Sequence, residues 1–461
     1  MENKKQLSIT LGLAAALAGL FLWRALAGDS SVAGLVAGAA QTLLFVLALV
    51  PVVGQSGRFF TEAEGLSPDS ALGERSLRRT RRHPWGELAA FVLLSKAAVL
   101  LLAYFAFCIG KEYPGGLWDT LEEVWFRSDS PSYVGIARNW YVTAGDPRFH
   151  IVFFPFYPIV TAGFDLFVQN THASAMLVSA VSSVAAAVLL YETAALDFPR
   201  ETALRAVKYA FIMPAAFFFT APMTESLFFA LTLGAVYCVR KRKYFIGCAL
   251  AALSGFTRSV GGLLLAFIAF EWLKDVLDAR RRGAPGGEKK ALALRGLCML
   301  LVPLGLAGYL YINYAVTGDP LTFMTYQKEH WSQGLGFFFE SAAVQLEYAA
   351  SAANGGDLAS LFGLWIPNLI YTFGSLALIA LSAKRLRASY TVYFLVYFVV
   401  TCGATWLLSA PRYLAAAFPL PLGLAVLTAE GGKGCDAAAT LICLALLAGY
   451  LGMYANGLYV Y

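Results

Sequence analysis

Long apolar runs separated by short polar stretches dominate this chain. Runs of about 20 apolar residues, the length that crosses a bilayer as a helix, recur along it. They cover roughly residues 6–27, 31–53, 87–109, 172–191, 296–316, 361–381, 390–409 and 437–455. Because backbone polar groups must be satisfied internally in lipid, these runs predict transmembrane helices.

Two further apolar segments predict incomplete spans. Segment 153–169 is short and has two prolines near its start, which favours a half-membrane or juxtamembrane helix. Block 244–273 has basic clusters on both sides, so an even number of crossings must fit into it. The pattern predicts two short helices there, with Thr257 and Arg258 at the apex.

Segments 209–222 and 227–239 predict an outward and a returning segment, with a turn at 224–226 on the outer face. Counted together, the pattern predicts an all-α polytopic membrane protein of about 13 transmembrane helices, with juxtamembrane helices at the outer face. The composition agrees, because 59% of the 461 residues are hydrophobic and only 14% are charged.

The positive charges are not spread evenly. The net charge is +6, and the basic residues form short clusters beside apolar runs, the pattern of cytoplasmic loops. These clusters lie at 75–82, 200–208, 240–243, 274–295 and 384–387. Loops 110–152 and 317–360 then fall outside and the N-terminus inside. No nucleic-acid surface is expected.

The pattern divides the chain into four parts. The first apolar run is too long for the core of a signal peptide and is taken as a span. The expected parts are an N-terminal hairpin (1–53), a cytoplasmic linker (54–86), a main membrane domain (87–430) with outer loops 110–152 and 317–360, and a C-terminal helix (431–461).

Loop 110–152 holds the first candidate chemistry, with an amphipathic surface helix expected around Ile136 to Tyr141. Asp129, in Ser-Asp-Ser-Pro-Ser-Tyr, could accept a proton from an attacking hydroxyl. It could equally cap a helix that begins at Pro131. Asp119, next to Trp118, is a second candidate, with a solvated loop acid as its alternative.

Glu225 and Arg258 are charges placed among apolar runs, where an unpaired charge is costly. Glu225 either faces a site or, with Thr224, caps the following helix. Arg258 suits a phosphate, since a guanidinium binds oxyanions with several donors. The alternative is an internal ion pair, for example with Glu225.

Three further features carry polar or aromatic groups. Arg412 ends a span, either as an anion ligand or as a lipid headgroup contact. Gln327, His330 and Trp331 either bind a sugar ring or form an interfacial turn. The seven cysteines and four histidines show no metal-ligand spacing. No cofactor is expected, although the acids Asp119, Asp129 and Glu225 leave a divalent ion possible.

Several local patterns, taken in order, resemble the PIG-V-like mannosyltransferases of the GT-C class over about residues 87 to 425. They are Asp129-Ser130 to Tyr133, Ile136-Ala137, Trp140-Tyr141, Phe153 to Pro158, Pro222 to Phe228, Thr257-Arg258 and Pro411 to Leu414. Departures are Ser132 for the usual Trp, Asn139 for Gly and Ser259 for Pro, and the hairpin 1–53 lies outside the resemblance. They bear on the substrate more than on the reaction.

The resemblance implies a GT-C-like bundle that transfers mannose or a related hexose, with inversion, from a polyprenyl-phosphate donor to an acceptor hydroxyl at the outer face. The implied roles are a base (Asp129, or Asp119), a carboxylate orienting the acceptor or supporting the base (Glu225), donor-phosphate ligands (Arg258, Arg412) and sugar or acceptor ligands (Trp118, Tyr133, Tyr157, Gln327, Trp331, Tyr413). The expected partners are the donor, a lipid or glycan acceptor and membrane lipids.

Another class of protein also fits parts of the pattern. Broken helices and membrane-embedded charges are found in transporters, so a transporter or flippase of a lipid-linked sugar is the alternative. The clustering of acids at the outer face favours the enzyme. The compact loops and the spans rich in Ala, Gly and Leu favour a bacterial plasma membrane.

Overall fold

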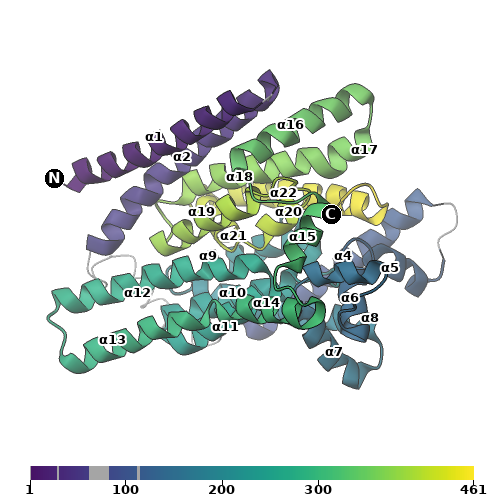
Figure 1. Cartoon of the computed structure of the whole chain (residues 1–461), viewed down its shortest axis with the longest axis horizontal. Helices are drawn as coiled ribbons and strands as arrows, with labels where there is room; N and C mark the ends of the chain where they lie inside the picture. The colour runs from purple at the N-terminus through teal and green to yellow at the C-terminus, as the bar shows by residue number, and fades with distance from the viewer. Residues whose placement is uncertain (1, 29–30, 62–82, 112–114, 461) are drawn as a thin grey trace.

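The computed structural model describes residues 2–28, 31–61, 83–111 and 115–460, and these are almost entirely helical (Figure 1). Strand pairing among them is limited to one isolated bridge between Leu335 and Ala404. The expectation of an all-α protein is therefore confirmed. The predicted linker 54–86 lies largely outside the described residues, and α2 (Val32–Thr61) runs into its first part.

The described residues contain seven segments long and apolar enough to cross a membrane, or eight if the pair η1 (Asp146–Val152) and α7 (Phe156–Val168), bent by 111°, is one span. The seven lie in α1 (Glu2–Ala27), α2, α4 (Trp85–Gly110), α8 (Thr171–Ala194), α13 to α14 (Gly286–Thr317), α17 to α18 (Leu358–Ser382) and α22 (Gly432–Ala455). A multi-pass membrane protein is confirmed, whereas the count of about 13 spans is not.

Shorter helices account for the difference in count. The chain also passes through the bundle in α9 (Arg200–Ile212), α10 (Glu225–Arg240), α11 (Tyr244–Thr257), α12 (Leu264–Arg281), α19 (Ala388–Cys402), α20 (Ala410–Ala415) and α21 (Pro419–Glu430). Breaks interrupt several of these segments, so most are shorter than the about 20 residues of a full span.

Two of the breaks were expected from the sequence. Arg258 is extended between α11 and the short helix η3 (Ser259–Leu263), which confirms the predicted apex. Helix α7 (Phe156–Val168) is short and follows η1 (Asp146–Val152) at a sharp bend, as predicted for a partial span.

The turn at 224–226 is buried within the protein. The whole stretch 215–226, including the short helix η2 (Ala216–Phe219), is buried. Three phenylalanines, at 217–219, contribute to this burial. They are almost fully buried, and Phe217 packs against Tyr450 and Tyr454 of α22. Burying these large rings holds the turn inside the protein.

The predicted outer loops are also more helical than expected. Loop 110–152 contains α5 (Leu117–Trp125) and α6 (Ser130–Asn139), and α6 ends early because Trp140 adopts a left-handed backbone with φ 59°. Tyr141, which the sequence predicted within the amphipathic helix, therefore lies beyond α6.

Region 317–360 is also largely helical. It forms α15 (Thr322–Trp331) and α16 (Phe338–Gly355), and α16 packs along α2. Phe338 stacks on Phe45 of α2 at 4.9 Å between ring centroids. A Cβ on Gly38 would lie only 3.0 Å from the Phe339 carbonyl oxygen, so glycine permits this close approach.

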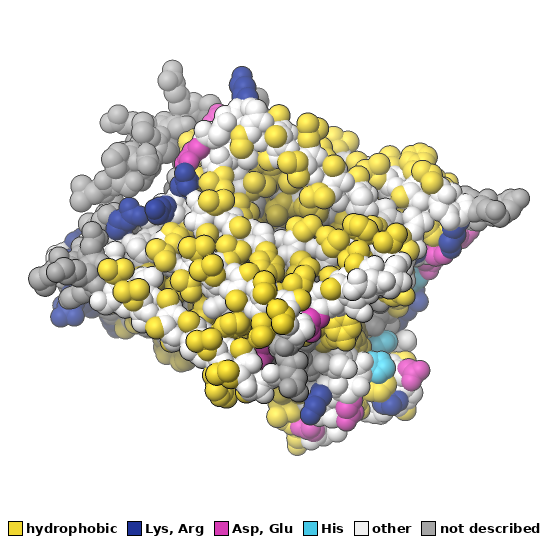
Figure 2. Space-filling model, turned by 90° about the horizontal axis from the view of Figure 1, so that it is seen from above, with side chains coloured by type: hydrophobic (Ala, Val, Ile, Leu, Met, Phe, Trp, Pro, Cys, Tyr) yellow, Lys and Arg dark blue, Asp and Glu magenta, His cyan; other side chains and the backbone are white. Residues whose placement is uncertain are grey.

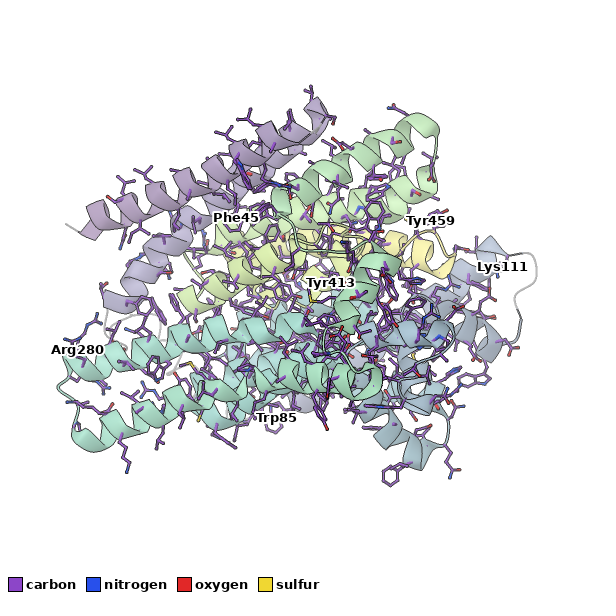
Figure 3. The ribbon with its side chains drawn as sticks, in the orientation of Figure 1. Phe45, Trp85, Lys111, Arg280, Tyr413 and Tyr459 are labelled. Carbon is purple, nitrogen blue, oxygen red and sulfur yellow. The ribbon has the colours of Figure 1, made fainter. Side chains whose placement is uncertain are left out.

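The helices run mainly along the long axis of the molecule (Figure 1). Arg280, at the end of α12, and Lys111, after α4, lie at opposite ends of this axis, with Tyr413 between them (Figure 3). Figure 2 shows hydrophobic side chains over the middle of one face and charged side chains mainly toward its ends. This distribution fits a membrane around the middle of the bundle.

Candidate active site

Four charged side chains from distant parts of the chain meet in a continuous cluster. Arg412 Nη2 lies 2.7 Å from Asp129 Oδ2, and Arg412 Nε lies 3.2 Å from Glu225 Oε1. Arg258 Nη1 donates a hydrogen bond to the same Glu225 oxygen at 2.7 Å. We call these four residues the charge cluster. Arg412 is its centre, because it touches both carboxylates.

Breaks in the helices position the members of the cluster. Asp129 directly precedes α6, and Glu225 is the first residue of α10. Arg258 sits in the link between α11 and η3, and Arg412 in the short helix α20. At helix ends and links, side chains can converge from directions that continuous parallel helices do not offer. The interruptions of the spans therefore build the site.

The charge cluster has no net charge, and its side chains differ in their exposure. The side chains of Glu225, Arg412 and Arg258 are 2%, 8% and 11% exposed, whereas that of Asp129 is 26% exposed. Two carboxylates balance two guanidinium groups, as burial of charge requires. Asp129 is therefore the most accessible member of the charge cluster.

The geometry bears on the alternatives left open by the sequence. Arg258 does form the internal ion pair with Glu225, and Arg412 is buried in the cluster instead of reaching lipid headgroups. Neither Asp129 nor Thr224 caps its helix through its side chain. The carboxylate of Asp129 is directed to Arg412 instead.

Aromatic and sulfur groups surround the two guanidinium groups. The ring of Tyr413 lies 4.5 Å from the Arg258 guanidinium carbon and 5.3 Å from that of Arg412. Arg412 Nη1 also contacts Met223 Sδ at 3.7 Å, and its guanidinium carbon lies 5.9 Å from the ring of Phe218. The aromatic rings stabilise the guanidinium groups through their faces and leave the guanidinium edges for anions.

A row of aromatic rings extends from the cluster toward α15. Burial, together with the nearby carboxylates of Asp129 and Glu225, raises the pKa of Tyr133, so its hydroxyl stays protonated. The Tyr133 ring packs edge-on against Phe153 at 5.2 Å, and Phe153 against Trp331 at 6.0 Å. The structure thus connects Tyr133 and Trp331 in one aromatic wall.

Other sequence candidates lie elsewhere or serve the fold. Tyr157 contacts Tyr133 but is fully buried, and its hydroxyl donates to the Ala175 carbonyl of α8. Gln327 donates to Gln333. Trp118 and Asp119 are exposed on α5, and they are not among the side chains that meet in the charge cluster.

Several buried polar atoms at the cluster have no hydrogen-bond partner within the described residues. They are Glu225 Oε2, Arg412 Nε, Ser130 Oγ and Ser226 Oγ. Buried polar groups are normally satisfied, so these atoms are candidate contacts for a polar ligand. No group of three or more His, Cys, Asp or Glu suited to a metal occurs among the residues described.

Sequence reasoning missed some residues near the cluster. Met223 and Phe218 contact Arg412, but nothing in their sequence context indicates this. Lys96 could have been found, because it is a lone charge inside the apolar run of α4. It is buried and donates to the Phe219 carbonyl of the turn that carries Met223 and Glu225.

Comparison with known proteins identifies the central segment. Residues 152–319 match the model of the mannosyltransferase (PIG-V) family. The match confirms the resemblance to that family. It also supports the expected class of enzyme, a glycosyltransferase. It contains Glu225 and Arg258, whereas Asp129 and Arg412 lie outside it. The curated proteins yielded no significant match.

Two solved structures show similarity to this chain. ArnT from Cupriavidus metallidurans, bound to undecaprenyl phosphate, matches 78% of this chain at 16% identity with a TM-score of 0.47. The archaeal oligosaccharyltransferase AglB from Archaeoglobus fulgidus, in complex with an inhibitory peptide and a dolichol-phosphate, matches 79% at 12% identity with a TM-score of 0.31. The chain covers 64% of the former and 56% of the latter.

Proposed function

Taking the match of residues 152–319 to the PIG-V mannosyltransferase family as the premise, we propose that this chain transfers mannose or a related hexose from a polyprenyl-phosphate donor to an acceptor hydroxyl. The observation that carries the proposal is the charge cluster. It combines an accessible carboxylate with two buried guanidinium groups in a bundle of apolar helices. Base, anion ligands and a lipid environment are what such a transfer requires.

In the proposed reaction, the acceptor oxygen attacks the anomeric carbon from the side opposite the phosphate. A bond forms between this oxygen and the anomeric carbon, and the bond from that carbon to the phosphate oxygen breaks. The acceptor proton passes to Asp129, and polyprenyl phosphate leaves with the bonding electrons. Attack from the opposite side inverts the anomeric configuration. General-base assistance of this kind contributes about 10²- to 10⁴-fold in rate.

Arg258 and Arg412 stabilise the leaving phosphate in this proposal. Negative charge develops on the phosphate as the glycosidic bond breaks, and fixed guanidinium groups in a water-poor site stabilise it strongly. Glu225 holds both arginines in place, and its free Oε2 can accept a hydrogen bond from a hydroxyl of the sugar or of the acceptor. Tyr133 and Trp331 form the wall for the sugar.

The donor phosphate would also free the base. Arg412 is paired with Asp129 in this structure, so the carboxylate that would take up the acceptor proton is occupied by an ion pair. A phosphate offers Arg412 a competing partner, so donor binding shifts Arg412 away from Asp129. The proposed order is therefore donor first and acceptor second.

We further propose that the reaction takes place at the outer face of a plasma membrane of bacterial type. The basic clusters at 240–243, 274–295 and 384–387 support a cytoplasmic end near Arg280. Lys111 and the helices α5 and α6 then lie at the outer end, with Asp129 beside them.

Product formation in detergent tests the proposal against a lipid-linked sugar transporter. Purified protein is mixed with polyprenyl-phosphate mannose and candidate lipid or glycan acceptors, and mannosylated products are measured. Transport needs two compartments and is impossible in micelles, whereas transfer is not. Transfer in micelles supports the enzyme. Flipping in vesicles without transfer to any acceptor would instead support the transporter, which the broken helices also fit.

Arg258→Met should weaken binding of polyprenyl phosphate about 10- to 100-fold, because one charge-assisted contact contributes about 1.5–3 kcal/mol. Binding is measured by titration in detergent. The matched control is Arg385→Met, which removes an arginine paired with Glu430 outside the cluster. Equal affinity in the two variants would show that Arg258 does not bind the phosphate and serves only as the ion-pair partner of Glu225.

Chelation should leave the transfer rate unchanged. Asp129 and Glu225 both face Arg412, so a divalent cation between them would be repelled by a guanidinium. The measurement is the transfer rate with and without EDTA, followed by added Mg²⁺ or Mn²⁺. Loss of activity that either ion restores would contradict the metal-free mechanism.

A further inference from the structure

A buried lysine lies halfway along a membrane-spanning helix. Lys96 of α4 is 8% exposed, and its Nζ donates to the carbonyl oxygen of Phe219. In the described part of the chain, no carboxylate forms an ion pair with it. A charge in the apolar interior of a membrane protein is costly, so its retention calls for a role.

The carbonyl that Lys96 contacts belongs to the buried turn 216–225. The helix is broken there, so some peptide groups lack helical partners and must find others away from water. Side chains from α8 provide part of this support, since Ser179 Oγ donates to the Ala221 carbonyl at 2.8 Å. Lys96 provides the support from α4.

The neighbouring hydroxyl cannot replace the lysine. Ser183 Oγ lies 3.2 Å from the Phe219 carbonyl oxygen but only 2.8 Å from that of Ser179. A serine hydroxyl can donate only one hydrogen bond, and Ser183 donates it over the shorter contact, to the Ser179 carbonyl of its own helix. The Phe219 carbonyl therefore depends mainly on Lys96.

The same turn encloses the centre of the charge cluster. Phe218, Met223 and Glu225 all contact Arg412, through ring face, sulfur and carboxylate. A shift of the turn would move these three contacts together, and with them the guanidinium that bridges Glu225 to Asp129. The position of the Phe219 carbonyl is therefore linked to the geometry of the reacting groups.

We propose that Lys96 is a positioning residue for the transfer reaction, which acts by anchoring the turn 216–225 around Arg412. The proposal rests on the function proposed above. Lys96 itself contacts none of the reacting groups named there. Its effect passes through the backbone, and it fixes where Glu225 and Arg412 lie when donor and acceptor are bound.

Two measurements on the full-length protein in lipid nanodiscs test this role. Hydrogen–deuterium exchange of peptides covering 216–225 reports the anchoring without any substrate. Transfer kinetics with polyprenyl-phosphate mannose report the consequence. In Lys96→Met, we expect exchange of the turn to quicken about tenfold and kcat to fall about 10- to 100-fold, as for a small misplacement of reacting groups. The donor KM should change less than about threefold, because both arginines remain.

Two variants provide the comparison. Lys96→Arg keeps a cationic donor of similar length and should restore exchange and kcat to within about threefold of the wild type. Ser183→Ala removes the other group near the same carbonyl and should have little effect on either. If Lys96→Met cannot be recovered folded, Lys96→Gln, a shorter neutral donor, should show both changes in smaller measure.

The outcomes separate the inference from the proposed function. Unchanged exchange of the turn in Lys96→Met or Lys96→Gln would overturn the anchoring role, whatever the activity. Equal effects of Lys96→Met and Ser183→Ala would also overturn it, since the Phe219 carbonyl would then depend on the serine as much as on the lysine. A wild-type protein that transfers no hexose would overturn the proposed function, while the exchange data would still decide the role of Lys96.

Discussion

Asp129→Asn should lower the rate of hexose transfer by about 10²- to 10⁴-fold, the contribution of a positioned general base. The amide keeps the size of the side chain and can still face Arg412, but it cannot take up the acceptor proton. The variant leaves two guanidinium groups and one carboxylate, but because the Asp129 side chain is 26% exposed, the loss of stability should be smaller than for a fully buried partner, and the rate is expressed per folded molecule. The measurement is single-turnover transfer with saturating donor, which isolates the chemical step.

Two controls accompany this variant. Asp119→Asn alters the exposed acid on α5 and should change the rate less than about threefold. Asp129→Asn should bind polyprenyl phosphate at least as tightly as the wild type, because Arg412 loses a competing carboxylate. If Asp119→Asn abolished transfer while Asp129→Asn did not, Asp119 would be the base.

The sequence predicted those parts of the fold in which the apolar pattern is long and uninterrupted. Helices α4, α8 and α22 lie close to the predicted runs 87–109, 172–191 and 437–455. The break at Arg258 was also predictable, since a basic cluster at each end of a 30-residue block permits no other threading. Charge placement and length decide such features locally.

The buried turn and α16 could not be predicted in the same way. An apolar stretch of about 14 residues, such as 209–222, suits a partial span, a re-entrant segment or a core turn equally well. Tertiary packing decides between these possibilities. The rings of Phe217 and Tyr454, far apart in sequence, meet at 5.1 Å, and that contact appears in no local pattern.

The candidate site was predictable in its parts but not in its connections. Charges flanked by apolar runs pointed to Glu225 and Arg258, because isolated charges need partners there. The pairing of Arg412 with Asp129 depends on how α20 and α6 pack, and the sequence left the headgroup alternative open. Lys96 gave the same kind of signal as Arg258, a lone charge in an apolar run.

Arg412→Met should have the second large effect, because it removes the one side chain that bridges both acids. The cluster would keep two carboxylates and a single guanidinium, which leaves an uncompensated buried negative charge. Breaking a buried ion pair in this way costs about 3–5 kcal/mol of stability. Transfer should also fall by about 10³-fold in the protein that remains folded, since the leaving phosphate loses a preorganised cation.

A charge-balanced double variant separates these two effects. Arg412→Met combined with Glu225→Gln leaves Asp129 and Arg258, so the net charge of the cluster is zero again and part of the lost stability should return, although each remaining charge has lost its own partner. Transfer should not return, because the phosphate still lacks its second guanidinium. Thermal unfolding in detergent and transfer per folded molecule are measured on the single and double variants.

Arg240→Met is the matched control for a buried arginine outside the site. Arg240 pairs with Asp197 at 2.6 Å and has a side chain 9% exposed, close to the 8% of Arg412. Its loss should destabilise the protein to a similar degree, for the same electrostatic reason, yet leave transfer per folded molecule within about threefold of the wild type. Transfer restored in the double variant, or lost equally in Arg240→Met, would show that Arg412 acts on the fold alone.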